Sequence, residues 1–423
     1  MSRVAIIGTG YVGLTTGAVM AHLGHQVVCA DLDAAKVERL NQADLHIFEP
    51  GLQEMVLAGL HSGRLRFVVG AAEAARGCEF AFLCVQTPQG DGGEADLSWV
   101  LAAARELASV VPTGTIVINK STVPVGSAAR VAEAIGRTDV MVASNPEFLR
   151  EGTAVADCLQ PDRIVVGAPT REAAEAVVGL YKGISAPVVT TDVVSAEMIK
   201  YASNAFLAVK LSYVNEIAAL CERLGADALD VVNGMGYDQR IGKNALQPGP
   251  GWGGSCLPKD TAALSHMASA VGSDMGVLRA AMLANDEQRR RVVDKVVAAL
   301  PSGLKGARVA CWGLTFKANT DDLRESPALT AIETMLAAGA VVTAFDPQIT
   351  TPPVAGLSVV DDPLAATAGA QVLVVLTEWP MFAQVDLRAV REQMAGAAIV
   401  DARNLLDRHT ARSLGFTYVG IGR

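Results

Sequence analysis

The sequence of 423 residues lacks the patterns that mark several classes of protein. No apolar run approaches the roughly 18 uninterrupted residues of a membrane span, and no basic, apolar export signal precedes the first strand-like segment at Arg3. We therefore expect a cytoplasmic protein without a membrane partner. Excess positive charge is also missing, because 35 Lys and Arg against 44 Asp and Glu leave a net charge of −9, which argues against a nucleic-acid partner.

Cysteine and histidine lack the spacing of disulfide frameworks and metal sites. The seven cysteines are scattered and include no C-x-x-C pair, and the six histidines show no ligand spacing, so no metal is expected. Six of the cysteines lie in apolar strand-like or helix-like segments, where a small buried side chain is the ordinary interpretation. Cys256 is the exception, because it follows a glycine-rich segment.

The apolar content predicts more than one folded domain. Half of the residues are hydrophobic (51%) and 19% are charged, which excludes a disordered chain, and the length suits two or three domains. Apolar runs at 4–7, 27–30, 80–85, 115–119, 140–144, 163–166 and 187–189 alternate with helical segments. This alternation predicts one doubly wound parallel sheet over residues 1–192.

The middle of the chain has a different pattern. Residues 195–224 contain no Gly or Pro and place apolar side chains at intervals of three and four, which predicts a long helix, and 275–300 predicts a second. These helices are too apolar for a solvated linker, so we expect residues 193–300 to form the core of a homodimer. Strands at 308–312, 341–345, 371–376 and 398–400, with a helix at 326–338, then predict a smaller α/β domain over 301–423. The expected fold class is α/β, with two Rossmann-like doubly wound domains joined by a central long-helix region.

A glycine-rich turn follows the first strand. Gly8-Thr9-Gly10-Tyr11-Val12-Gly13 has the G-x-G-x-x-G spacing in which glycines allow a tight turn, backbone approach to a pyrophosphate and close helix packing. A turn with packing glycines is the alternative interpretation. Asp31 ends the second strand eighteen residues after Gly13, where a carboxylate binds ribose hydroxyls and repels a 2′-phosphate. NAD is therefore the expected cofactor.

A second glycine-rich segment, residues 251–255, leads into Cys256. The helix expected from Leu257 places its positive end beside the sulfur, which favours the thiolate. Lys259 and Asp260 follow within one helical turn. A cysteine in such a loop is more often inert, but this combination favours a nucleophile.

Other polar residues stand out against apolar surroundings. Lys200 and Asn204 are four residues apart on the long helix and share one face; a solvated stripe is the alternative, but their neighbours are largely apolar. Thr122, Glu147 and Glu151 follow strands at the edge where open α/β sheets bind ligands. In the last domain, Lys317 and Arg324 precede a helix and suit phosphate groups, although a charged, capped helix start explains them too.

These segments, GTGYVG, KSTVPVG, NPEFLREG, GGSCLPKD and FKANTDDLRESP, resemble in sequence and order the UDP-glucose/GDP-mannose dehydrogenase family. The resemblance implies an NAD domain, a dimeric helical core and a UDP-sugar domain. It also implies oxidation of the C6 hydroxyl of UDP-glucose to UDP-glucuronate with two NAD⁺, through a thiohemiacetal and a thioester on the cysteine.

The resemblance also implies roles for individual residues. Catalytic roles fall to Cys256, Lys200, Asn204, Asp260, Glu147 and Thr122. Cofactor contacts fall to Gly8, Gly10, Tyr11, Val12, Gly13, Asp31, Lys36, Val85, Thr87, Pro88, Ser121, Thr122, Glu151, Lys259 and Arg324. Substrate contacts fall to Glu147, Phe148, Leu149, Arg150, Glu151, Lys200, Asn204, Arg240, Trp252, Gly253, Cys256, Phe316, Lys317 and Arg403.

Two alternatives remain at this point. A sibling enzyme would perform the same four-electron oxidation on GDP-mannose or a UDP-N-acetylhexosamine. A protein of another class, a non-catalytic NAD-binding regulator, would keep the fold without the chemistry, and the joint presence of Cys256, Lys200, Asn204, Asp260 and Glu147 argues against it. Gln86 and Trp252 stand where many members carry other residues, a smaller one and Tyr or Phe respectively.

Overall fold

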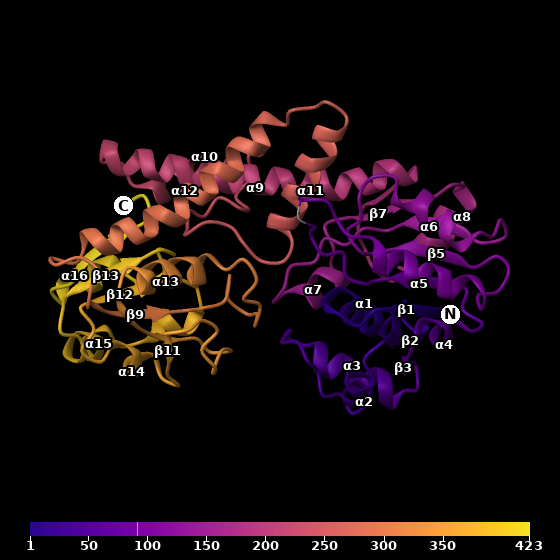
Figure 1. Ribbon diagram of the computed structural model, residues 1–423, viewed down its shortest axis with the longest axis horizontal. Helices are drawn as coiled ribbons and strands as arrows, with labels where there is room; N and C mark the ends of the chain where they lie inside the picture. The colour runs from indigo at the N-terminus through magenta and orange to yellow at the C-terminus, as the bar shows by residue number, and fades with distance from the viewer. Residues whose placement is uncertain (91) are drawn as a thin grey trace. The chain divides into compact units, whose positions relative to one another are not determined.

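The computed structural model describes residues 1–90 and 92–423, and these form two compact units. The first unit comprises Met1–Ser203 and Ala262–Gly272, and the second comprises Asn204–Thr261 and Ser273–Arg423. Two helices, α9 (Val193–Leu224) and α11 (Leu257–Ala270), carry the chain from one unit into the other (Figure 1). The domain limits expected at residues 192 and 300 stay a prediction.

The first unit contains an eight-stranded sheet in the order β3-β2-β1-β4-β5-β6-β7-β8. Its strands are β1 (Arg3–Ile7), β2 (Gln26–Asp31), β3 (Leu65–Val69), β4 (Phe80–Leu83), β5 (Ile116–Asn119), β6 (Met141–Ser144), β7 (Ile164–Gly167) and β8 (Val188–Thr191). Pairing is parallel except at the antiparallel bridge between β6 and β7. The seven predicted strands are confirmed, with small shifts at their ends. Strand β3 was not expected, because Arg66 interrupts the apolar residues of this short edge strand.

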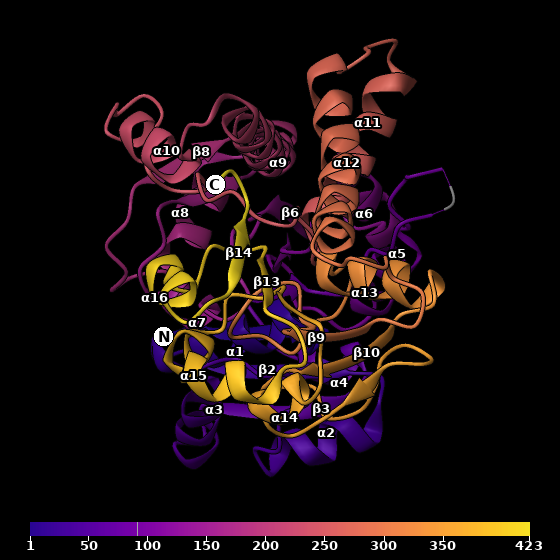
Figure 2. The ribbon, with the colours of Figure 1, turned by 90° about the vertical axis from the view of Figure 1, so that its left-hand side faces the viewer.

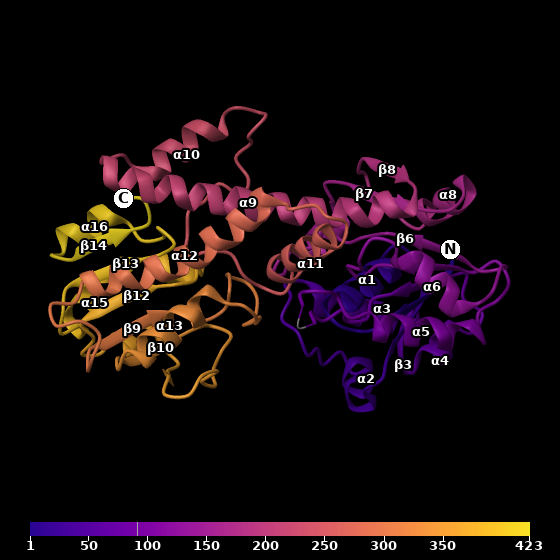
Figure 3. The ribbon, with the colours of Figure 1, turned by 45° about the horizontal axis from the view of Figure 1, so that its top comes forward.

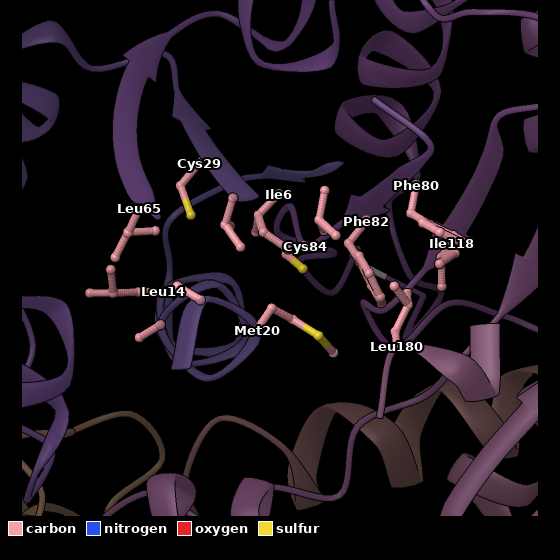
Figure 4. Close-up of a cluster of buried hydrophobic side chains, with 14 of the residues drawn as sticks. Ile6, Leu14, Met20, Cys29, Leu65, Phe80, Phe82, Cys84, Ile118 and Leu180 are labelled. Carbon is pink, nitrogen blue, oxygen red and sulfur yellow. The ribbon is translucent and has the colours of Figure 1, made fainter. Parts of the chain in front are cut away.

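Helices cover both faces of this sheet. They are α1 (Tyr11–His22), α2 (Ala34–Asn41), α3 (Leu52–His61), α4 (Ala71–Ala75), α5 (Ser98–Ala108), α6 (Ser127–Ile135), α7 (Ala154–Leu159) and α8 (Arg171–Gly179). Ile6 and Phe82 face Leu14 and Met20 of α1 in one core (Figure 4). The neighbouring strand residues point to the other core, where α5 and α6 lie side by side (Figure 3). Burial on both faces explains why the central strands β1 and β4 are almost continuously apolar.

The second unit contains a six-stranded parallel sheet in the order β11-β10-β9-β12-β13-β14. Its strands are β9 (Arg308–Trp312), β10 (Val341–Phe345), β11 (Ser358–Val359), β12 (Val372–Val375), β13 (Ala398–Asp401) and β14 (Thr417–Gly420). Its helices are α10 (Ala228–Gly236), α12 (Gly276–Ala298), α13 (Pro327–Ala337), α14 (Pro363–Thr367), α15 (Leu387–Gln393) and α16 (Arg408–Ser413), with a 3₁₀ turn at Pro380–Gln384. The second α/β sheet is therefore confirmed, with the unexpected short strand β11 and strand β14 added.

The long helices pack on this second sheet. Val292, Val293 and Val296 of α12 share one core with α13, the strands and the last turns of α9, and α12 lies beside α13 (Figure 2). Tertiary packing of this kind supplies most of the stability of such helices. Across the described residues, no helix is long and apolar enough to cross a membrane.

The cysteines follow the expected burial with one correction. Cys29, Cys78, Cys84, Cys221 and Cys311 are buried, whereas Cys158 is only half-buried. Its helix α7 has six residues and buries only Ala154 completely, so the short apolar segment overstated its burial.

Candidate active site

The glycine turn of the first unit leaves little room for side chains. Gly8 has a φ of +98°, and a Cβ atom there would lie 2.7 Å from the carbonyl oxygen of Cys84. A Cβ on Gly13 would lie 1.9 Å from the carbonyl oxygen of Gly8, so helix α1 packs directly on the turn. At Gly10 a Cβ would meet nothing within 4 Å, and α1 begins at the next residue, Tyr11. The half-buried helix start therefore has the open space that a pyrophosphate needs.

The carboxylate of Asp31 lies at the end of β2 beside this turn. Its Oδ2 accepts hydrogen bonds from Thr9 N–H at 3.2 Å, Thr9 Oγ1 at 2.5 Å and Lys36 Nζ at 2.8 Å. Burial opposes ionisation, but these donors and the backbone N–H of Asp33 lower the pKa of Asp31 to about 2. Asp31 is thus a carboxylate at neutral pH, as ribose binding requires. Lys36 forms an ion pair with this carboxylate. Its expected contact with a cofactor phosphate stays a prediction.

The segments after β4 and β5 are tied together at the carboxyl edge of the sheet. Ser121 Oγ donates a hydrogen bond to the carbonyl oxygen of Val85 at 2.6 Å, and Thr87 Oγ1 donates to the carbonyl oxygen of Thr122 at 2.9 Å. Pro88 follows Thr87, and its carbonyl oxygen accepts from Asp96 N–H at 2.8 Å. The first unit thus gathers these predicted cofactor residues on adjoining loops.

Glu147 and Lys200 form a buried ion pair. Lys200 Nζ lies 2.8 Å from Glu147 Oε1, and both side chains are 4% exposed. Burial raises the pKa of Glu147, but the charge and hydrogen bond of Lys200 outweigh it and hold this pKa below its ordinary value, with help from Leu149 N–H and Lys120. Lys200 is therefore not on a solvated stripe. It is a buried ammonium 5.5 Å from the centre of the Phe148 ring.

Two carboxylates that the sequence analysis missed hold these loops in place. Glu49 is buried and accepts hydrogen bonds from Gly152 N–H at 2.6 Å and Ala154 N–H at 2.7 Å, next to the predicted ligand residue Glu151. Tyr11 Oη also lies 2.8 Å from Gly152 N, which joins the glycine turn to this segment. Arg150 is exposed and forms an ion pair with Asp157, and its contact with a substrate stays a prediction.

The second of these carboxylates, Glu197, lies on α9 one turn before Lys200. It accepts from Gly126 N–H at 2.6 Å and Ala128 N–H at 2.9 Å, at the start of α6 and just after the segment that carries Thr122. Burial raises the pKa of Glu197 despite these donors. The sequence feature that could have identified Glu197 is an acidic residue within an apolar helical segment.

In the second unit, Asp260 lies one helical turn after Cys256 and binds two other predicted site residues, Lys259 and Asn204. Helix α11 begins at Leu257, directly after the half-buried Cys256. Asp260 is 0% exposed; its Oδ1 accepts from Lys259 Nζ at 2.7 Å and its Oδ2 accepts from Asn204 Nδ2 at 2.6 Å. A thiol at a helix start, with an ammonium and a carboxylate one turn away, is a setting suited to a nucleophile.

The predicted substrate residues Arg403 and Arg240 and the predicted cofactor residue Arg324 have different settings in the second unit. Arg403 donates to the carbonyl oxygen of Phe316 at 2.8 Å, so it supports the segment that carries Lys317. Arg240 and Arg324 are exposed and form ion pairs with Asp238 and Asp322, at 2.6 Å each.

Trp252 and Gly253 are closely packed within the second unit. The indole N–H of the buried Trp252 donates to Ser212 Oγ at 2.9 Å, so this hydrogen bond fixes the Trp252 side chain within the unit. A Cβ on Gly253 would lie 2.0 Å from the carbonyl oxygen of Glu325. Their contact with a substrate stays a prediction. No cluster of three or more His, Cys, Asp or Glu suited to a metal ion occurs within residues 1–90 and 92–423.

Comparison with known protein families finds three matching models along the chain. Residues 2–185 match the NAD binding domain of the UDP-glucose/GDP-mannose dehydrogenase family, residues 194–287 its central domain and residues 310–408 its UDP binding domain.

Individual relatives match over the full length. A UDP-glucose 6-dehydrogenase of Rhizobium meliloti is 42% identical over 434 aligned residues, covering 100% of this chain and 99% of that protein. One from Pseudomonas aeruginosa is also 42% identical, covering 100% and 97%. The solved UDP-glucose dehydrogenase of Pyrobaculum islandicum has a TM-score of 0.91 and 38% identity, covering 100% and 98%. The UDP-D-ManNAc dehydrogenase of Pyrococcus horikoshii has a TM-score of 0.89 and 29% identity, covering 100% and 99%.

Proposed function

Because the chain belongs to the UDP-glucose/GDP-mannose dehydrogenase family of NAD-dependent oxidoreductases, we propose that it oxidises the C6 hydroxyl of UDP-glucose to the carboxylate of UDP-glucuronate. The observation that carries the proposal is the group at the start of α11, where Cys256 is followed one turn later by the buried Asp260 with its two donors. The names of the full-length relatives favour UDP-glucose as the substrate.

The residues of the first unit fit NAD. The open helix start at Gly10 suits the pyrophosphate, and the ionised Asp31 suits the ribose hydroxyls. When bound, NAD accepts the hydride in each of the two oxidations.

The protein's own residues then supply capture, charge stabilisation and proton transfer. The Cys256 thiolate adds to the C6 aldehyde formed by the first oxidation and gives a thiohemiacetal. Loss of a second hydride from C6, with the hydroxyl proton passing to a base, leaves a thioester. Water attacks the thioester, which releases the carboxylate and the thiol. We propose that Lys200 and Asn204 stabilise the oxyanions, with Lys200 or a water held by Asp260 and Thr122 as the base, and that Glu147 assists hydrolysis.

Substrate panels test this proposal directly. We expect UDP-glucose to give the highest kcat/KM among UDP-glucose, GDP-mannose and UDP-N-acetylhexosamines, and two NADH per sugar consumed, because covalent capture keeps the aldehyde on the enzyme. The measurement is NADH absorbance together with sugar analysis. Preference for another nucleotide sugar would support a sibling activity. No NADH with any of them would support a non-catalytic NAD-binding regulator.

Cofactor selectivity gives a second prediction, which rests on Asp31. Replacing Asp31 by Ser removes both the ribose acceptor and the charge that repels a 2′-phosphate, and leaves Lys36 without its carboxylate. We expect the KM for NAD⁺ to rise about tenfold or more and the KM for NADP⁺ to fall, by loss of one charge-assisted interaction. Asp33→Ser, two residues away, is the control, because Asp33 caps α2. An unchanged NAD⁺/NADP⁺ ratio in Asp31→Ser would contradict the assignment.

We also propose that the chain forms a homodimer through the apolar side chains that the second unit exposes. On α9, Phe206 is 67% exposed, Tyr213 50%, Leu220 49% and Leu224 73%. Apolar surface of this extent along one helix is typical of a contact between protein chains. We expect Phe206→Asp with Leu220→Asp to convert the dimer into a monomer in light-scattering measurements. A wild-type monomer, or a double variant that stays dimeric, would contradict the proposal.

A further inference from the structure

The glycine-rich segment before Cys256 is held by a buried amide from another helix. Asn285 lies on α12 and is 2% exposed. Its Oδ1 accepts a hydrogen bond from Trp252 N–H at 2.8 Å, and its Nδ2 donates to the carbonyl oxygen of Trp252 at 3.0 Å. One side chain thus satisfies both backbone groups of Trp252, four residues before Cys256, in the way that a neighbouring strand would.

Further polar side chains anchor the same segment. Gln288, one turn later on α12, donates from Nε2 to the carbonyl oxygen of Gly249 at 2.7 Å. Asn215 of α9 accepts from Gly249 N–H at 2.9 Å. Arg289 adds a bond from Nη2 to the carbonyl oxygen of Trp252 at 3.0 Å. The segment therefore has fixed contacts at Gly249 and at Trp252, three positions apart.

The glycines explain how closely the segment is enclosed. Gly251 has a φ of +114°, and a Cβ there would lie 2.9 Å from Asn285 Oδ1. The backbone N–H of Gly254 donates to the carbonyl oxygen of Arg324 at 3.1 Å. The segment is therefore in contact with Asn285 at Gly251 and with the backbone of Arg324 at Gly254, just before Cys256 and the first turn of α11.

We propose that Asn285 is a positioning residue for the reaction, which fixes the backbone of residues 249–255 and through it the location of the Cys256 sulfur. The inference rests on the proposed function, because it requires Cys256 to be the nucleophile. An amide is needed at position 285, since a carboxylate has no donor for the Trp252 carbonyl and an alkyl side chain has neither group. Gln288 provides a second anchor farther from the sulfur.

The test uses Asn285→Asp, which keeps the shape of the side chain and removes its donor. We expect kcat for UDP-glucose to fall about 10- to 100-fold, because displacements near 1 Å reduce catalysis by such factors. The affinity for NADH, which depends on the first unit, should be unchanged. Deuterium exchange in residues 249–256 should become faster. Gln288→Ala should give a smaller decrease in kcat.

Two variants on the same helix serve as controls. Val292→Ala removes two methyl groups from the core of the second unit without touching the segment, so it lowers stability but should leave kcat and exchange in 249–256 unchanged. Asp286→Ala changes an exposed neighbour and should behave as the wild type.

The outcomes separate this inference from the proposed function. Wild-type kcat and exchange in Asn285→Asp, measured with an active wild-type enzyme, would overturn the positioning role alone. A decrease in kcat in Val292→Ala equal to that in Asn285→Asp would also overturn it, because general destabilisation would then explain both. Absence of turnover in the wild type would overturn the proposed function and the positioning role with it. An active Cys256→Ser variant would show that Cys256 is not the nucleophile, which would overturn the covalent mechanism and the positioning role that depends on it.

Discussion

Cys256→Ser should lose at least about 10³-fold in kcat for NADH formation from UDP-glucose, because a hydroxyl at the start of α11 is a far weaker nucleophile than a thiolate. Binding of NADH should be unchanged, since Asp31 and the glycine turn belong to the first unit. Steady-state assays and fluorescence titration with NADH measure the two effects separately. A sulfur placed after a glycine-rich segment and before a helix is the feature under test.

A second cysteine of the same unit provides the control. Cys221 lies on α9 within the apolar core, so Cys221→Ala should retain turnover and lose only some stability. Mass spectrometry after brief treatment with iodoacetamide should show modification at Cys256 before the buried cysteines, with a rate that rises with pH. Undiminished NADH production by Cys256→Ser would remove the thioester mechanism and leave a stepwise oxidation without covalent capture.

Lys200→Met should have the second large effect, on activity and stability together. The variant leaves Glu147 as a buried carboxylate without its ammonium, and breaking a buried ion pair in this way costs about 3–5 kcal/mol of unfolding free energy. Activity should fall about 100-fold or more if Lys200 also stabilises an oxyanion or moves a proton. Urea unfolding and initial rates are the measurements.

The double variant Lys200→Met with Glu147→Leu separates the two roles. Replacing both charges by apolar side chains removes the uncompensated carboxylate, so stability should largely return. Turnover should not return, because the ammonium of Lys200 is still missing. A double variant that regains both stability and turnover would show that the pair is only structural.

The same pair predicts how stability depends on pH. The folded-state pKa of Glu147 lies below its ordinary value of 4.5, so its ionised form stabilises the fold above that pH, and this contribution is lost as the pH falls through the folded-state pKa. Asp31 acts in the same direction, between its ordinary value of 3.8 and about 2. The difference in unfolding free energy between the wild type and Glu147→Gln should therefore shrink as the pH falls from about 4.5, where the unfolded chain takes up a proton at Glu147, through the lower folded-state pKa, where the folded protein does so too.

Periodic features were predictable from the sequence. Strands β1, β4 and β5 are apolar because both faces of a parallel sheet are covered, and the long helix α9 repeats apolar positions over nine turns without Gly or Pro. Gly8 and Gly13 were recognisable because their spacing reflects a local requirement for a tight turn. Short strand β11 and edge strand β3 were missed, since a strand of two residues and an apolar run interrupted by Arg66 produce no comparable signal.

The local requirements of helices, strands and tight turns thus determined, from the sequence alone, the two α/β sheets, the glycine turn and the cysteine at a helix start. Tertiary structure decided which polar groups meet. Asp260 binds Asn204, which is 56 positions away in the sequence, and Glu49 caps a helix 105 positions later. Asn285 binds the backbone of Trp252, which is 33 positions away. Such contacts join single residues with no periodic pattern, and a buried polar group finds its partner only when folding brings distant segments together and removes water from both.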